Sequence, residues 1–108
     1  MEAIVDAFGP EEQALGWYYY LQDKIVFPFK ARCVRERSIS PLRKGELIVV
    51  ESMAPEDDCM REMFVMAKWK GRSLGFPLSQ LVTAQSNEET EEAVGDWRYW
   101  VDRDYEFG

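Results

Sequence analysis

Apolar residues near the start of the chain recur every three or four positions, which is the spacing of one face of an α-helix. We expect this helix to begin near Pro10, because proline suits the first helical position. Pro28 should end it, because proline biases the preceding residue toward extended geometry. The predicted buried face consists of Ala14, Trp17, Tyr18, Leu21 and Ile25.

The same helical spacing returns near the end of the sequence. Ser86 and Glu89 match the capping box of a helix N-terminus, so we expect a second helix to begin at Ser86. The acidic residues that follow are ordinary first-turn residues, since the helix dipole favours negative charge there. The predicted apolar stripe consists of Ala93, Val94, Trp97, Trp100 and Val101.

Short alternating or β-branched segments between the helices predict about five strands. Gly71 and Arg72 fit a two-residue hairpin turn with glycine first. Five short strands with tight connections are typical of a small SH3-like barrel. We therefore predict an α+β fold for residues 1–108, in which one SH3-like β-barrel is flanked by N-terminal and C-terminal helices. The expected strands are Phe29–Val34, Leu47–Val50, Met63–Lys70, Ser73–Phe76 and Leu81–Ala84.

The charge of the chain favours a cationic ligand. Residues 1–54 carry 8 acidic and 7 basic side chains, whereas residues 55–108 carry 12 acidic and 6 basic side chains. The net charge of −7 argues against nucleic acid as a partner. Lys68, Lys70 and Arg72 around Trp69 could suggest nucleic acid, but a solvated strand face is the favoured interpretation.

Several residue types needed for common chemistry are missing. The chain has no histidine, and its two cysteines are too few for a zinc site, which needs about four ligands. No phosphate-binding loop or nucleophile elbow occurs, so we expect no enzyme. Cys33 and Cys59 are predicted to be reduced thiols of a cytoplasmic protein, with one disulfide as the alternative. We expect no signal peptide and no membrane span.

Two groups of oxygen-bearing residues could bind calcium, which takes about 6–8 oxygen ligands. Asp23 lies near the predicted end of the first helix, where backbone carbonyls lack partners, and the carbonyl of Ile25 could join it. Glu56, Asp57 and Asp58 form an acidic loop that could fold around an ion. The alternative for Asp23 is a surface carboxylate that pairs with Lys24 or an arginine. The alternative for the acidic loop is that it is simply solvated.

A third acidic group closes the chain. Asp102 and Asp104, with Glu106, have the spacing that opens an EF-hand loop. However, no glycine occupies the sixth place and no glutamate the twelfth, so we predict that the segment is not an EF-hand. The two aspartates could still join Asp23 if the tail packs beside the first helix.

Two motifs resemble those of the cyanobacterial-type calcium-binding proteins, the CcbP-like family. The first runs from Trp17 to Phe29 and resembles the pattern W-Y-Y-Y-L-E-D-x-[IL]-x-F-P-F, with Gln22 in place of an acid. The second, D-W-R-Y-W-V, begins at Asp96, and Asp104 follows where the family has glycine. The resemblance implies a non-catalytic Ca²⁺ buffer or sensor of the bacterial cytoplasm, with calcium as ligand and any protein partner unknown.

Other functions remain open from the residues alone. The exposed aromatics of an SH3-like barrel often dock peptides, so the alternative is a protein-interaction module without metal. The aromatic residues of the two helices could also form a ligand platform. Their helical spacing favours a core position instead, with some tyrosine hydroxyls donating hydrogen bonds to the acidic sites.

Overall fold

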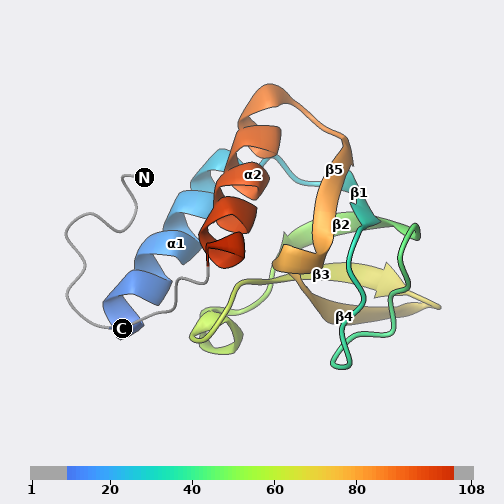
Figure 1. Cartoon of the computed structure of the whole chain (residues 1–108), viewed down its shortest axis with the longest axis horizontal. Helices are drawn as coiled ribbons and strands as arrows, with labels where there is room; N and C mark the ends of the chain where they lie inside the picture. The colour runs from blue at the N-terminus through green and yellow to red at the C-terminus, as the bar shows by residue number, and fades with distance from the viewer. Residues whose placement is uncertain (1–9, 104–108) are drawn as a thin grey trace.

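A computed structural model describes residues 10–103 of the chain (Figure 1). In this part of the chain, two α-helices accompany a five-stranded antiparallel sheet, so the predicted α+β fold is confirmed. The elements in chain order are α1 (Pro10–Lys24), β1 (Phe29–Cys33), β2 (Leu47–Met53), η2 (Glu56–Cys59), β3 (Phe64–Trp69), β4 (Arg72–Pro77), η3 (Leu78–Gln80), β5 (Leu81–Gln85) and α2 (Glu88–Asp102).

The sheet has the strand order β4-β3-β2-β1-β5. Each strand pairs antiparallel with its neighbour, and β2 is the central strand. Within residues 10–103, β4 and β5 are opposite edges that do not pair with each other. The sheet is therefore open rather than a closed barrel, because closure would need a backbone ladder between these two strands.

The two helices pack against each other in antiparallel directions (Figure 1). The ring of Trp17 lies 5.1 Å from that of Trp97 and 5.7 Å from that of Trp100, measured between centroids. Beyond the C-terminal end of α1, the Val26 N–H donates to Oγ1 of Thr90 in the first turn of α2, at 2.9 Å. The end of α1 thus lies beside the start of α2.

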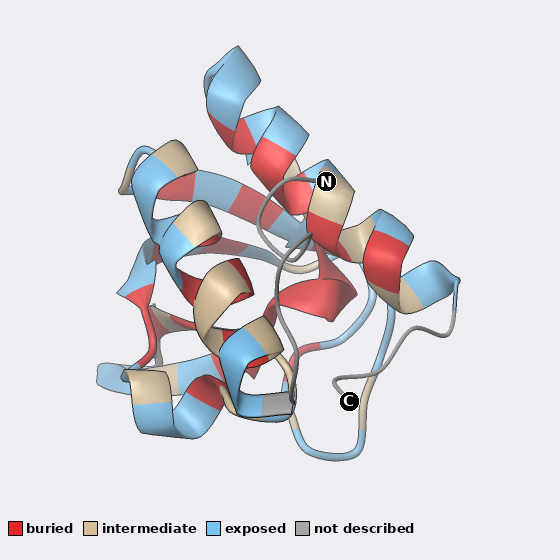
Figure 2. Ribbon diagram, turned by 90° about the vertical axis from the view of Figure 1, so that its left-hand side faces the viewer, coloured by how far each residue is buried: buried red, intermediate tan, exposed pale blue. Residues whose placement is uncertain are grey.

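The predicted apolar faces of both helices enter the core (Figure 2). All five residues predicted for the first face are buried, although Ile25 lies just after the end of α1. On α2 the predicted stripe is buried except for Val101, which is half-buried against the core. Aromatic residues of both helices therefore serve mainly as core, as their spacing predicts.

The turn between β3 and β4 and the N-terminal cap of α2 each differ from the sequence prediction by one residue. The hairpin between β3 and β4 turns at Lys70 and Gly71, which both have positive φ, rather than at Gly71 and Arg72. Two positive φ angles give the turn type that matches the twist of a hairpin. The cap of α2 is Asn87 rather than Ser86, because Oδ1 of Asn87 accepts the N–H of Thr90 at 2.8 Å.

Candidate metal sites

The acidic segment Glu56–Cys59 is a short 3₁₀ helix, η2, rather than an irregular loop. A 3₁₀ helix has three residues per turn, so consecutive side chains point about 120° apart. The carboxylates of Glu56, Asp57 and Asp58 therefore diverge instead of surrounding one point. The predicted inward folding of all three around a single ion is not seen in this conformation.

Buried contacts hold both ends of η2 in place. Before the turn, the hydroxyl of Tyr18 donates a 2.7 Å hydrogen bond to the carbonyl of Ala54. After it, the Phe64 N–H donates to Sγ of Cys59 at 3.4 Å. The Cys59 side chain is buried, and this burial raises the pKa of its thiol. Asp57 and Asp58 are thus exposed, and Glu56 is half-buried, on a turn whose backbone is anchored in the core.

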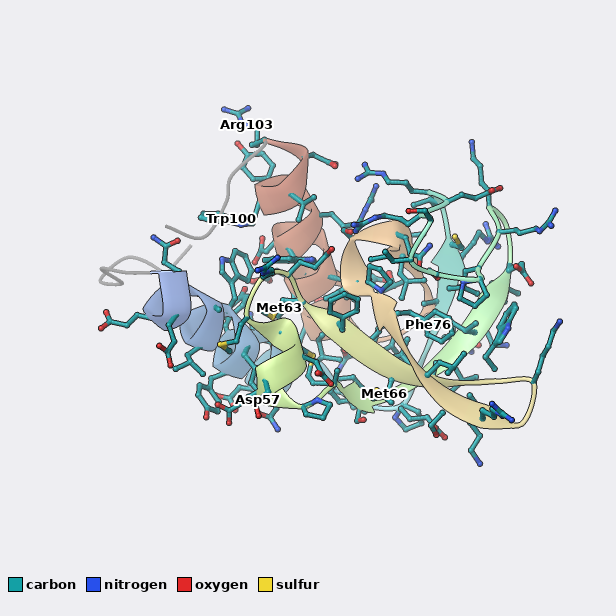
Figure 3. The ribbon with its side chains drawn as sticks, turned by 90° about the horizontal axis from the view of Figure 1, so that it is seen from below. Asp57, Met63, Met66, Phe76, Trp100 and Arg103 are labelled. Carbon is teal, nitrogen blue, oxygen red and sulfur yellow. The ribbon has the colours of Figure 1, made fainter. Side chains whose placement is uncertain are left out.

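Tyr19 connects α1 to the first acid of η2. Its hydroxyl donates to Oε2 of Glu56 at 2.8 Å, and this hydrogen bond raises the pKa of the Tyr19 phenol. Asp57 and Asp58 are exposed and form no ion pair with any residue between 10 and 103. Figure 3 shows Asp57 on this turn beside α1. Two carboxylates of η2 are therefore available to a cation without displacing a basic side chain.

Asp58 also borders an apolar pocket of about 460 Å³. Asp58 itself is exposed, so its carboxylate is accessible to a cation from solvent beside this apolar wall. The other lining residues are Ala54, Pro55, Phe64, Met66 and Gly75.

Asp23 lies near the C-terminal end of α1, where the sequence places it. It is exposed, and no ion pair joins it to another described residue. The N–H of Ile25 donates to the Leu21 carbonyl at 2.9 Å and continues the helical pattern, while the Ile25 side chain is buried. The neighbouring Lys24 pairs with Glu92 at 2.9 Å, so Asp23 remains free for a cation.

Asp102 lies at the C-terminal end of α2 and forms a 2.9 Å ion pair with Arg35. Because the helices are antiparallel, this end of α2 lies far from the C-terminal end of α1. A helix of 15 residues is about 22 Å long, so Asp23 and Asp102 cannot share one ion. Asp104 lies outside the described residues.

The candidate oxygens are thus distributed over separate places. Between residues 10 and 103, no three carboxylate or thiol side chains are grouped so that they could hold a metal ion. Any ion bound to this conformation would take one or two carboxylates and complete its shell with backbone carbonyls and water, which suits calcium. The predicted tyrosine donor at an acidic site is Tyr19, which donates to Glu56. Tyr20 donates at 2.5 Å to Asp96, which is not one of the candidate ligands.

Comparison with known proteins relates this arrangement to a family. The model for the CcbP family, described by the words calcium binding, matches residues 1–101. The chain belongs to this calcium-binding family. The resemblance of the aromatic motifs is thereby confirmed.

Two solved structures are similar over nearly the whole chain. The crystal structure of Anabaena CcbP is 36% identical with a TM-score of 0.82, and the match covers 96% of this chain and 85% of that one. A calcium binding protein in the calcium-binding form is 36% identical with a TM-score of 0.80, covering 97% and 86%. A search of curated protein sequences finds no match. In the described part of the chain, no helix has the length and apolarity to cross a membrane.

Proposed function

We propose that residues 1–108 form one calcium-binding domain that acts as a buffer or sensor in the bacterial cytoplasm, without catalysis. The observation that carries this proposal is the match over 97% of the chain, at 36% identity, to a protein in its calcium-binding form. The description of the family concerns binding rather than a reaction, which supports a non-enzymatic role. A metal-free interaction module is correspondingly disfavoured.

The turn η2 is the primary calcium site in this proposal. Asp57 and Asp58 have no basic partner in the described structure, and Glu56 is held beside them by Tyr19. Because the three carboxylates diverge, we infer that calcium either binds two of them with water, or rewinds the turn so that all three converge. Calcium tolerates such irregular coordination, whereas magnesium requires a near-ideal octahedron.

The two helix ends are secondary sites. Asp23, with the carbonyl of Ile25, is proposed to bind calcium at the negative end of the α1 dipole. Asp102 and Asp104 are proposed as a further site at the end of the chain. Calcium must compete there with Arg35 for the Asp102 carboxylate, so this site should be weaker than η2.

The open sheet is proposed to be a relative of the SH3-like barrel. Support comes from the short turn η3, which connects β4 to β5 and lets the last strand return to the far edge beside β1. This arrangement places five short strands in one sheet, and the connections from β3 to β4 and from β4 to β5 are tight. Residues 34–46 and 54–63 form longer connections between the earlier strands.

Isothermal titration calorimetry with calcium and with magnesium tests the proposed function. The double variant Asp57→Asn/Asp58→Asn should weaken calcium binding by about tenfold, because affinity follows the number of charged ligands. The matched control is Glu88→Gln/Glu89→Gln, which removes the same charge from two exposed acids in the first turn of α2.

The control pair should change the calcium affinity by less than about twofold, and magnesium should compete poorly. Equal losses in the two double variants would mean that calcium responds only to net charge. The assignment of η2 would then be wrong. Absence of calcium binding by the unaltered protein would refute the proposed function itself.

A further inference from the structure

The exposed face of the central strand β2 carries apolar side chains. Leu47 is 51% exposed and Val49 is 48% exposed, in a strand whose alternate residues Ile48 and Val50 are buried. The exposed positions of the neighbouring strand are basic: Lys30 lies opposite Val49 and Arg32 opposite Leu47. An apolar strip is thus flanked by positive charge in a protein with a net charge of −7.

A groove of about 460 Å³ lies over this strip, which we call the β2 groove. Lys30 borders it from β1. Lys68 borders it from β3, since it follows Ala67, the partner of Val50. Residues opposite each other on adjacent strands are about 5 Å apart, so the two lysines flank Val49 from both sides. The lining residues are Lys30, Leu47, Ile48, Val49, Glu51, Lys68 and Trp69.

The two lysines have no acidic partner within residues 10–103. Lys24, Arg35 and Arg37, by contrast, each form an ion pair with a carboxylate elsewhere in the fold. Glu51 is the single acid that lines the groove. The groove therefore combines an apolar floor with two ammonium groups that are available to an incoming anion.

We propose that the β2 groove binds an extended segment of a partner protein in which acidic side chains alternate with apolar ones. The apolar side chains would cover Leu47, Val49 and the exposed part of Trp69, where removal of apolar surface from water favours association. The carboxylates would pair with Lys30 and Lys68, which gives the charge complementarity that selects an acidic peptide.

The same observations disfavour nucleic acid as the occupant. A phosphate backbone would meet the lysines but would gain nothing from Leu47 and Val49. The net charge of −7 would also repel it at distances longer than the groove. A surface of this size supports weak, reversible binding rather than a permanent complex.

Fluorescence anisotropy with a labelled synthetic peptide of sequence EVELEF tests the proposal. The peptides KVKLKF and EGEGEG serve as probes in which the charge or the apolar side chains are changed. EVELEF should bind at least about tenfold more tightly than either, and its affinity should fall with added salt. Equal binding of the three peptides, or no binding of EVELEF at millimolar protein, would overturn the proposal.

Variants locate the binding on the sheet face. Lys30→Glu/Lys68→Glu should weaken EVELEF binding by about tenfold or more, whereas the control Arg43→Glu/Lys44→Glu should change it by less than about twofold. The control reverses two exposed charges in the loop before β2. If charge reversal prevents folding, as judged by circular dichroism, Lys30→Gln/Lys68→Gln provides the same comparison with smaller expected loss. Equal effects of the groove and loop variants would place the peptide elsewhere.

Three further measurements distinguish the proposed peptide from other occupants and separate this proposal from the proposed calcium function. Concentration-dependent dimers in sedimentation velocity that disappear in Lys30→Glu/Lys68→Glu would identify a second copy as the occupant and overturn the proposal. Tighter binding of single-stranded poly(dT) than of EVELEF would do the same in favour of nucleic acid. The groove variants should still bind calcium, because no η2 residue lines the groove, so failure of either proposal leaves the other intact.

Discussion

Removing the hydroxyl of Tyr18 should destabilise the protein by about 1–3 kcal/mol, which is the cost of leaving a buried polar group without its partner. The hydroxyl donates a 2.7 Å hydrogen bond to the carbonyl of Ala54. Tyr18 is 7% exposed and Ala54 is 1% exposed, so water has little access to that carbonyl in Tyr18→Phe. The bond connects α1 to the backbone that leads into η2.

In a domain of about this size, a loss of 1 kcal/mol lowers the melting temperature by about 4–8 °C. Tyr18→Phe should therefore melt at least about 4 °C below the unaltered protein. Urea denaturation followed by circular dichroism should show a lower midpoint with an unchanged m-value, because the surface exposed on unfolding is the same.

The adjacent variant Tyr19→Phe is the matched control. It removes the same atom one residue later, but Tyr19 is 48% exposed, so water can take the place of its hydroxyl at the Glu56 carboxylate. Its midpoint should stay close to that of the unaltered protein. Equal midpoints for the two variants would refute the reasoning, since burial of the acceptor would then have no measurable effect.

Three further outcomes follow from the acidic positions. Asp23→Asn should weaken calcium binding more than Glu89→Gln in calorimetric titrations; equal affinities would contradict the assignment of Asp23. Amide hydrogen exchange in η2 should slow when calcium is added, with little change in β2; unchanged exchange in η2 would mean an ordinary solvated turn. The hydrogen bond to Glu56 raises the pKa of Tyr19, so its stabilising contribution is complete below the ordinary value of 10.0 and is lost as pH rises through the raised one. Spectrophotometric titration of Glu56→Gln should show a lower pKa for Tyr19; no change would exclude this cause.

Periodicity was sufficient to predict most elements of the fold. The spacing of Trp17, Leu21, Trp97 and Trp100 predicts two helix faces, and both are buried as expected. The openness of the sheet could not be read in this way, because it depends on whether β4 and β5 meet, and alternation within a strand says nothing about its neighbours.

The same distinction applies to the candidate sites. The sequence identifies Asp23, Glu56 and Asp102 as oxygen donors, but it does not fix their mutual directions. The antiparallel packing of α1 and α2 separates Asp23 from Asp102, and the 3₁₀ geometry of η2 spreads its carboxylates. Composition therefore predicts the ligand class, whereas long-range packing determines how many ions can bind.

The position of β2 limits how strongly the two proposed sites can influence each other. A strand rises about 3.4 Å per residue, so Met53 lies about 14 Å from Val49, and η2 begins three residues later. This distance to the centre of the groove exceeds the screening length of about 8 Å at physiological ionic strength, so calcium at η2 should alter the field at Val49 only weakly. The near end of the groove is closer, because Glu51 lines it and lies two residues from Met53. A large calcium-dependent change in EVELEF affinity that persists at that ionic strength would therefore point to movement transmitted through β2. An effect that appears only at low salt would be the direct electrostatic attraction expected when bound calcium reduces the negative charge of the protein.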